Sequence, residues 1–315
     1  MMRTPICDLF GIEYPIFQGG MAWVANASLA GAVSKAGGLG IIAAANAPVD
    51  VVREEIRSLR ESTDKPFGVN IMLMSPFAEE IAQLVIDERV PVVTTGAGLP
   101  TKYMKAWLAA GIKVVPVVPS VGVARMVERA GACAVVAEGG ESGGHIGELN
   151  TMALVPQVCD AVNIPVLAAG GIGDGRGVAA AMMLGAVGVQ LGTRFLVAKE
   201  CTIHENYKKK VLAAKDIDTM TTGCTLGNPV RALKNRFTRD FLANENNADM
   251  TLEEKEAFGA GALRRAVVEG DEQNGCFMAG EISGMVRREQ TCEEMIKEIF
   301  AQAETVLKGA QKWVK

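Results

Sequence analysis

Two glycine-rich segments in the second half of the chain could bind an anion through their backbone. The first, residues 169–175, reads AGGIGDG, and the second, residues 190–194, reads QLGTR. Glycine lacks a Cβ, so its amide can approach a ligand closely, and the N-terminus of a following helix adds positive potential. The two segments therefore predict a phosphate cradle, for which the candidate residues are Gly170, Gly171, Gly192 and Thr193.

Two other interpretations of these glycines have to be weighed. A Rossmann dinucleotide turn should follow an early strand and be answered by an acidic residue about twenty positions later. The residues at that distance here are Gln190, Leu191 and Gly192, and none of them is acidic. A tight structural turn without a ligand is the second alternative. The pairing of two such segments, each after a late apolar run, favours the phosphate cradle.

A third segment, residues 138–147, combines glycines, polar residues and one of the two histidines. Its sequence is EGGESGGHIG, so few of its side chains could pack in a core. His145 is our candidate functional residue, because it lies among glycines, although a lone histidine is more often structural. His204, the other histidine, lies in the charged stretch 200–210, and we expect it to be solvated.

The elements that must position these segments follow a regular alternation. Short apolar runs rich in Val and Ile recur every twenty to thirty residues, with helix-like stretches between them. About eight runs are present: 14–17, 39–44, 67–72, 90–94, 113–118, 132–137, 164–168 and 188–191. Helices are expected at 49–62, 76–88, 101–110, 121–130 and 177–184. Eight βα units predict an α/β fold of the (β/α)8 TIM barrel type, and an open doubly wound sheet is the alternative.

In a barrel, the ligand site lies at the carboxyl ends of the strands, and phosphate commonly binds after strands seven and eight. Both glycine-rich segments would lie there. Further candidates at the same end are residues 18–22 (QGGMA) after the first run, Asn70 after the third and residues 94–96 (TTG) after the fourth. Taken singly, Met21 could be a core filler and Asn70 a turn former. Their shared position at successive strand ends is the reason to retain them.

The alternation stops near Leu196. We therefore predict a barrel formed by residues 1–198 and 290–315, with residues 199–289 inserted over its mouth as a smaller substrate-covering segment. A closing helix is expected over 291–312, where Met295, Ile299 and Leu307 would face the core.

The inserted segment carries a local concentration of basic residues on an acidic protein. Residues 208–210 are three lysines, and a helix-like stretch further on contains Arg231, Lys234, Arg236 and Arg239. These side chains could form a solvated charged face. Alternatively, they could form a docking surface for an acidic partner, whose association would depend on salt.

Composition bounds the possible functions. The chain has 315 residues, of which 49% are hydrophobic and 22% charged, so it folds. A net charge of −4 provides no global field for nucleic acid. Polar residues interrupt the uncharged stretch 14–34, so no membrane span is expected, and the N-terminus has no secretory pattern. We expect a cytoplasmic protein.

Cysteine and histidine usage argues against disulfides and metal sites. The seven cysteines are single and odd in number, which suits a reducing compartment, and we expect them to be small buried hydrophobes. Neither histidine has a second histidine or cysteine at metal-ligand spacing, so we predict no metal.

The ordered set of motifs resembles the flavin-dependent barrel family that contains the nitronate monooxygenases and the FabK-type enoyl-acyl-carrier-protein reductases. The similarity extends from Pro15 to the closing helix. It rests on these segments: 18–21 (QGGM), 69–70 (VN), 138–147, 169–172 (AGGI) and 190–193 (QLGT). The monooxygenases usually read Q-G-x-E-A-G-G-H-R-G in the third of these. Here Glu138, Ser142 and Ile146 replace the Gln, Ala and Arg of that pattern, so the segment looks like the reductase version.

The resemblance implies FMN as cofactor and two half-reactions, in which NADH or NADPH donates a hydride that then reaches the β-carbon of a 2-enoyl thioester carried by acyl carrier protein. His145 would lie beside the flavin and serve as the catalytic group. The residues that would contact FMN are Gly20, Met21, Ala22, Asn70, Glu138, Gly143, Gly144, Gly170, Gly171, Gln190, Gly192 and Thr193.

The resemblance also leaves several points open. A homodimer is expected, and a monovalent cation could bind, for which residues 222–224 are a candidate loop. A nitronate monooxygenase and a flavin-binding protein without turnover are the alternatives. Sequence does not separate NADH from NADPH, and it does not fix the acyl-chain length.

Overall fold

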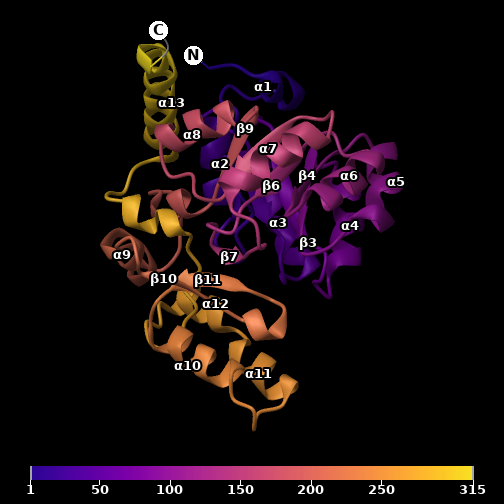
Figure 1. The fold of residues 1–315 in the computed structure, drawn as a ribbon. Coiled ribbons are helices and arrows are strands. Elements are labelled where there is room, and N and C mark those ends of the chain that lie inside the picture. Colours follow the sequence, from indigo (N-terminus) through magenta and orange to yellow (C-terminus); the bar gives the residue numbers. More distant parts are fainter. Residues whose placement is uncertain (1, 314–315) are drawn as a thin grey trace.

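A computed structural model describes residues 2–313 as a barrel with a smaller lobe at one end (Figure 1). Met1, Val314 and Lys315, which we assigned to the barrel, lie outside the described residues. Both labelled ends of the chain lie on the side of the barrel away from that lobe (Figure 1).

Eight parallel strands form the barrel, as predicted. They are β1 (Ile16–Gln18), β2 (Gly40–Ala43), β3 (Phe67–Met72), β4 (Val92–Gly96), β5 (Lys113–Val118), β6 (Val135–Glu138), β8 (Val166–Ala169) and β9 (Gly188–Leu191). They follow one another around the barrel in chain order, and β9 pairs with β1. Hydrogen bonds between the main chains of Gln18 and Leu39 (3.0 Å) and of Leu39 and Ile16 (2.9 Å) join β1 to the start of β2. The sheet therefore closes.

The inward side chains of the strands form a core separate from the one under the helices. The inner core contains Phe17, Ile41 and Val136, whereas their strand neighbours, such as Ile42, belong to the outer core. This alternation follows from the two-residue period of a strand. The first helix closes the inner core at the barrel's amino end, where the ring of Phe10 lies 5.1 Å from that of Phe17.

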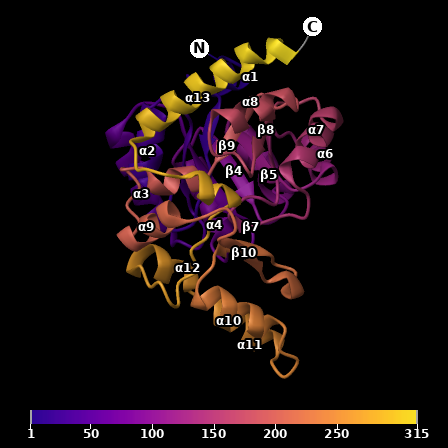
Figure 2. The ribbon, with the colours of Figure 1, turned by 60° about the vertical axis from the view of Figure 1, so that its left-hand side comes forward.

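Helices connect the strands and cover the outside of the barrel. They are α1 (Pro5–Phe10), α2 (Ala27–Lys35), α3 (Val49–Ser62), α4 (Ala78–Asp87), α5 (Thr101–Ala109), α6 (Val121–Arg129), α7 (Thr151–Ala161), α8 (Gly175–Met183) and α13 (Cys292–Gly309). The 3₁₀ turns η1 (Thr193–Val197) and η5 (Ala310–Trp313) complete this part of the chain. Met295 and Ile299 of α13 are buried, as expected, whereas Leu307 is only partly buried. Figure 2 shows this helix lying across α8 and α2.

The segment 199–289 forms the lobe at the barrel's carboxyl end (Figure 2). Its elements are α9 (Glu205–Ala213), β10 (Thr219–Thr222), η2 (Cys224–Leu226), β11 (Val230–Leu233), α10 (Arg236–Glu245), α11 (Leu252–Gly259), α12 (Ala262–Arg264), the π-turn η3 (Arg265–Glu269) and the 3₁₀ turn η4 (Glu281–Met285). Strands β10 and β11 pair antiparallel, and β11 also pairs with β7 (Gly144–His145) from the loop after β6. A small separate core surrounds Phe237, whose ring stacks on Phe258 at 5.6 Å.

Several expectations for this lobe are wrong. The stretch from Arg231 to Arg239 is not one helix, because Arg231 lies on β11 and only Arg236 and Arg239 lie on α10. Lys208 is buried, and its ammonium donates to the carbonyl of Ala198 at 2.9 Å, so it does not belong to a basic surface. The predicted basic surface is therefore reduced to its exposed members.

The burial of His204 and of some cysteines also differs from the prediction. His204 is partly buried rather than solvated, and its Nδ1 accepts from the amide of Asn206 at 3.1 Å, which caps α9. Four cysteines are buried as predicted, but Cys224 is exposed. All seven are free thiols. Burial raises the pKa of Cys276 to about 12, so this thiol is unreactive.

Candidate active site

A cavity of about 530 Å³ opens at the carboxyl ends of the barrel strands, a size typical of ligand pockets. The barrel contributes strand ends and loops to its wall, and the inserted lobe contributes Tyr207, Leu263, Met278, Gly280 and Ile282. All thirteen site residues predicted from the sequence line this cavity: Gly20, Met21, Ala22, Asn70, Glu138, Gly143, Gly144, His145, Gly170, Gly171, Gln190, Gly192 and Thr193. The sequence therefore placed these residues in one pocket.

The glycine turns after β8 and β9 leave main-chain donors free at one end of the cavity. Gly170 and Gly171 have φ values of +88° and +68°, which favour glycine. Within residues 2–313, the amides of Gly171, Gly192 and Thr193 donate to no other group of the chain. A Cβ at Gly171 would be in ordinary contact with the side chain of Glu141 at 3.5 Å and would meet nothing closer. Free amides in such turns fit a phosphate without a lysine.

The loop that follows β1 approaches strand β3 closely. A Cβ at Gly20 would lie 2.3 Å from the Cβ of Asn70, so only glycine fits there. Asn70 itself is held in place because its Nδ2 donates to Thr94 Oγ1 at 2.9 Å. Asn70 is therefore a placed polar group of the pocket rather than a turn former, and Met21 is a wall residue.

Gln18, although part of the same motif, serves the barrel instead. Its side chain is fully buried, with Oε1 accepting from the amide of Ile41 at 3.1 Å and Nε2 donating to the carbonyl of Ile41 at 3.2 Å. It joins β1 to β2 where the strands close. Buried Gln190, at the end of β9, lies against the backbone of Gly19 and forms part of the pocket floor.

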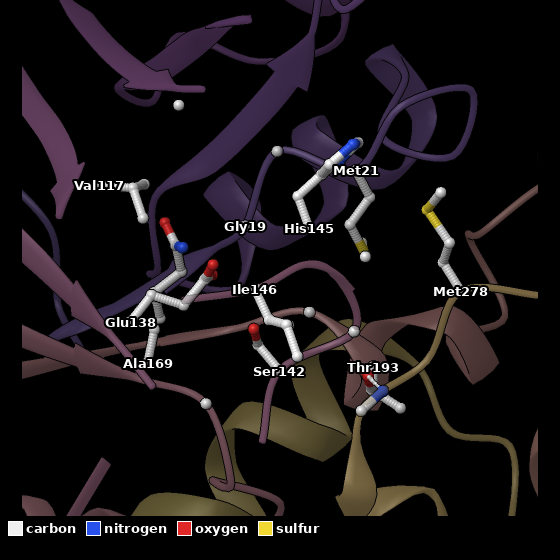
Figure 3. A pocket seen from close by; sticks show the side chains of 18 of the residues that line it. Gly19, Met21, Val117, Glu138, Ser142, His145, Ile146, Ala169, Thr193 and Met278 are labelled. Carbon is white, nitrogen blue, oxygen red and sulfur yellow. Dashed lines mark hydrogen bonds between the residues drawn. The ribbon is translucent and has the colours of Figure 1, made fainter. Parts of the chain in front are cut away.

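Glu138 ends β6 and places its carboxyl group in the cavity (Figure 3). Burial raises the pKa of Glu138 to about 7, against a weaker opposite effect of the Ser142 hydroxyl. A protonated carboxyl offers one donor and one acceptor, like the amide of the glutamine in the monooxygenase pattern. Near neutral pH, Glu138 can therefore provide the hydrogen bonds of a glutamine at this position.

His145 lies on β7 and is exposed to the pocket. Figure 3 places its ring near Met21, with Met278 of the inserted lobe on the same side. Partial desolvation lowers the pKa of His145 below its ordinary value of 6.5, so the imidazole is neutral at pH 7. A neutral imidazole can donate a hydrogen bond to a carbonyl oxygen without carrying charge.

Two residues that hold the sixth loop, which we define as residues 139–147 after β6, were not singled out from the sequence. Both carboxylate oxygens of Glu141 accept from the amide of Thr151 at 3.0 Å, and Oε2 also accepts from its hydroxyl at 2.8 Å. Glu141 therefore caps the N-terminus of α7 and fixes the loop to the barrel. The acidic residue within a glycine run was a possible signal, but its partner at position 151 was not visible in the sequence.

The lobe residues of the pocket were also missed. Leu263 and Met278 belong to short, irregular elements, and Tyr207 donates its hydroxyl to the carbonyl of Met278 at 2.6 Å. No periodicity marks Leu263 or Met278, because α12 has only three residues and Met278 lies in an isolated bridge, while Tyr207 is a buried residue of α9 like its neighbours. Residues 222–224, the candidate cation loop, do not line this cavity.

Two further features are absent from residues 2–313. These residues contain no group of three or more His, Cys, Asp or Glu side chains placed to hold a metal ion. No helix among them is long and apolar enough to cross a membrane.

The closed barrel, the free amides after β8 and β9 and the wall of side chains above them define a barrel enzyme that holds a phosphate-bearing ligand at its mouth. The family model described as nitronate monooxygenase matches residues 3–85 and 75–302. The chain belongs to this family, and it is an oxidoreductase of the FMN-dependent type.

Three relatives indicate where the chain lies within the family. The structure of FabK from Thermotoga maritima matches with a TM-score of 0.97 and 48% identity, over 100% of both chains. The (3aS,4S,5R,7aS)-5-hydroxy-7a-methyl-1-oxo-octahydro-1H-indene-4-carboxyl-CoA dehydrogenase of Mycobacterium tuberculosis is 34% identical over 99% of both chains. A probable nitronate monooxygenase of Staphylococcus saprophyticus is 35% identical over 75% of this chain and 80% of its own.

Proposed function

We propose that the protein is an FMN-dependent enoyl-acyl-carrier-protein reductase that uses NADH or NADPH, and that it completes a cycle of fatty-acid elongation. The observation that carries the proposal is the segment 138–147, where Glu138, Ser142 and Ile146 depart from the monooxygenase pattern around His145. The full-length similarity to FabK from Thermotoga maritima supports it. The mycobacterial relative, named as acting on a carboxyl-CoA, supports a thioester substrate.

The residues present fit FMN. Its phosphate would be held by the amides of Gly171, Gly192 and Thr193, and its polar ring edge would meet Asn70 and Glu138. When bound, FMN supplies the hydride chemistry. The chain supplies the rest: Met21 and Gly20 hold the ligand from the loop that follows β1, while Leu263 and Met278 exclude water from the lobe side.

His145 has the role of stabilising charge on the thioester carbonyl as the β-carbon is reduced. A neutral imidazole N–H directed at that oxygen stabilises the developing enolate, and a positioned donor of this kind contributes a factor of about 10²–10⁴. Since the pKa of His145 is already lowered, this role needs no change of charge at neutral pH.

We make three further proposals, which concern a bound cation, the oligomeric state and the location in the cell. We propose residues 222–224 as the place of a monovalent cation, because the buried carboxylate of Glu245 accepts there from the amide of Gly223. We further propose a cytoplasmic homodimer, consistent with the free thiols.

A steady-state assay with paired substrates tests the activity. NADH or NADPH should be consumed when crotonyl-CoA or an enoyl-acyl carrier protein is added under nitrogen. Turnover of a nitronate that requires oxygen, with no anaerobic enoyl reduction, would instead establish the second candidate, which the family match and the staphylococcal relative favour. A yellow protein inactive in both assays would be a flavin-binding protein.

A further inference from the structure

The loop that carries His145 has little intrinsic rigidity. Residues 139–147 include five glycines, and a free chain of this composition has a large conformational entropy to lose. On the barrel side, Glu141 holds the N-terminus of α7, and the amide of Gly140 donates to the carbonyl of Leu149 at 2.8 Å. These contacts fix the beginning of the loop, but His145 lies beyond them.

The inserted lobe holds the other side of the loop. Val230 pairs with His145 and Arg231 with Gly144, and the amide of Ile146 donates to the carbonyl of Pro229 at 3.1 Å. A strand of two residues gives few hydrogen bonds, and such short pairings are marginal by themselves. Side-chain contacts must therefore add to the stability of the pairing between β7 and β11.

Arg231 supplies these contacts from β11. Its side chain is only 16% exposed, and its Nε donates to the carbonyl oxygen of Gly140 at 3.1 Å. Its Nη1 lies 3.2 Å from Glu281 Oε1 and 3.4 Å from Thr219 Oγ1. One guanidinium thus joins the sixth loop, the β10–β11 hairpin and the start of η4.

Glu281 and its neighbour continue the same attachment. The amide of Glu281 donates to the carbonyl of Glu141 at 2.9 Å, next to the carbonyl that Arg231 binds. The amide of Gly280 donates to Thr193 Oγ1 at 2.8 Å, which ties the segment to the phosphate cradle. A Cβ at Gly143 would lie 2.6 Å from the carbonyl carbon of Ala279, so the loop and this segment are in close contact.

We propose that Arg231 is a positioning residue that holds the sixth loop, and with it His145, over the pocket. The inference deepens the proposed function, on which its activity measurements rest. The planar fork of the guanidinium directs separate donors at a carbonyl and a carboxylate in a fixed geometry, which the flexible ammonium of a lysine does not reproduce. Arg231 therefore acts inside the protein rather than as part of a docking surface.

Arg231→Met tests this proposal, because it keeps the length of the side chain and removes its donors and charge. We expect kcat with crotonyl-CoA to fall by about ten- to a hundredfold, as for small misplacements of catalytic groups, with KM for NADH within about threefold. Hydrogen exchange of peptides covering 139–147 should rise at least about tenfold because the loop opens more often. FMN content and exchange in the barrel strands should stay at wild-type levels.

Three further variants sharpen the test. Lys234→Met is the matched control, because Lys234 is exposed on the same lobe and donates to the carbonyl of Ile217, away from the loop. With crotonyl-CoA as substrate, and in exchange at 139–147, it should behave as wild type. Arg231→Lys should recover only part of the activity and of the protection. If Arg231→Met fails to fold, Arg231→Lys and Glu281→Gln carry the test, with smaller increases in exchange at the same peptides.

The possible outcomes separate this inference from the proposed function. Unchanged exchange at 139–147 in the folded Arg231 variants would overturn the positioning role, whatever the activity. A rise in KM for the acyl-carrier substrate alone, equal in Arg231→Met and Lys234→Met, would overturn it in favour of docking. A wild-type protein without enoyl-thioester reduction would overturn the proposed function, while the exchange comparison would still decide whether Arg231 holds the loop.

Discussion

The barrel and the inserted lobe both reach the pocket, but they do so by different means. The barrel presents main-chain groups and short side chains from the ends of eight strands, whose positions a closed ladder fixes. The lobe presents Leu263 from the three-residue helix α12 and Met278 from an isolated bridge to Ala232. It also approaches the loop after β1, where the guanidinium of Arg264 lies 5.9 Å from the ring centre of Trp23. The large buried core of the barrel extends to Leu263, whereas Met278 packs against the small aromatic core of the lobe.

This difference suggests that the barrel and its junction with the lobe have different functional roles. Anion binding by amides needs a backbone that does not move, since the donors cannot adjust independently, and a closed barrel provides such a backbone. Placement of His145 depends instead on contacts between barrel and lobe, such as the pairing of β7 with β11. Changes in the barrel turns should therefore abolish cofactor binding, and changes at the junction should alter turnover while the cofactor stays bound.

The largest effect is expected in the barrel turn at Gly171. Gly171→Asp places a carboxylate in the phosphate cradle, beside the side chain of Glu141, and should yield colourless protein. The measurement is flavin absorbance per mole of folded protein. Gly171→Asn is the control for backbone strain, because asparagine tolerates the left-handed conformation and has no charge. It should retain more flavin than the Asp variant, and fully flavinated Gly171→Asp protein would reject the cradle.

The next effect concerns His145, at the junction. His145→Ala should keep FMN and lose turnover by about 10²–10⁴ because the placed donor is removed. Because burial lowers the pKa of His145, this histidine should contribute no ionisation to the pH profile of kcat above pH 7. His204→Ala, which removes a cap of α9, should cost stability but little activity. Activity of His145→Ala within a few-fold of wild type would make this histidine structural.

A smaller effect is expected for stability at Glu138, whose pKa of about 7 exceeds the ordinary value of 4.5 because of burial. The folded protein therefore holds a proton that the unfolded chain releases, so this group lowers stability as pH rises from about 4.5 through 7. Without flavin, the free energy of unfolding of Glu138→Gln should exceed that of the wild-type protein by about 1–3 kcal/mol at pH 8. This difference should become smaller towards pH 5.

Urea unfolding of both proteins across this pH range measures the difference. Glu148→Gln, which changes an exposed carboxyl in the same loop, is the matched control. A difference between Glu138→Gln and wild type that does not vary with pH would show that Glu138 is ionised in the folded protein.

The smallest effect is expected on the outer face of the lobe. Lys234 and Arg239 remain exposed there, and together they could steer an acidic acyl carrier protein. Reversing both to Glu should raise KM for the acyl-carrier substrate about two- to fivefold at low salt and leave crotonyl-CoA unaffected. Reversing Lys105 and Arg129 on the barrel is the control. Equal changes for both substrates, or none, would exclude docking at this face.

Sequence was informative where local pattern decides structure. Strand β3 occupies 67–72, as its apolar run predicted, and the free amides after β8 and β9 lie at the predicted glycines. In a parallel barrel, every strand end points to one mouth, so finding the strands also places the residues that follow them. That is why Asn70 and Gly192, far apart in the chain, could be assigned to one pocket.

Sequence was uninformative where contacts between distant segments decide structure. Strand β7 has only Gly144 and His145, which no propensity marks as a strand, and it forms because β11 pairs with it. Arg231 looked like one of several surface cations, yet its partners Gly140 and Glu281 lie far from it in the chain. Such tertiary pairings override local preference and leave no periodic signal.

Anaerobic single-turnover stopped-flow most directly tests whether barrel and lobe together form an enoyl-thioester reductase. Flavin absorbance should bleach when the purified protein is mixed with NADH or NADPH, and it should return within the turnover time when crotonyl-CoA is added without oxygen. In His145→Ala, the second step should slow by about 10²–10⁴ while the protein remains yellow. Recovery of the absorbance only with oxygen, and none with crotonyl-CoA, would contradict the proposed function.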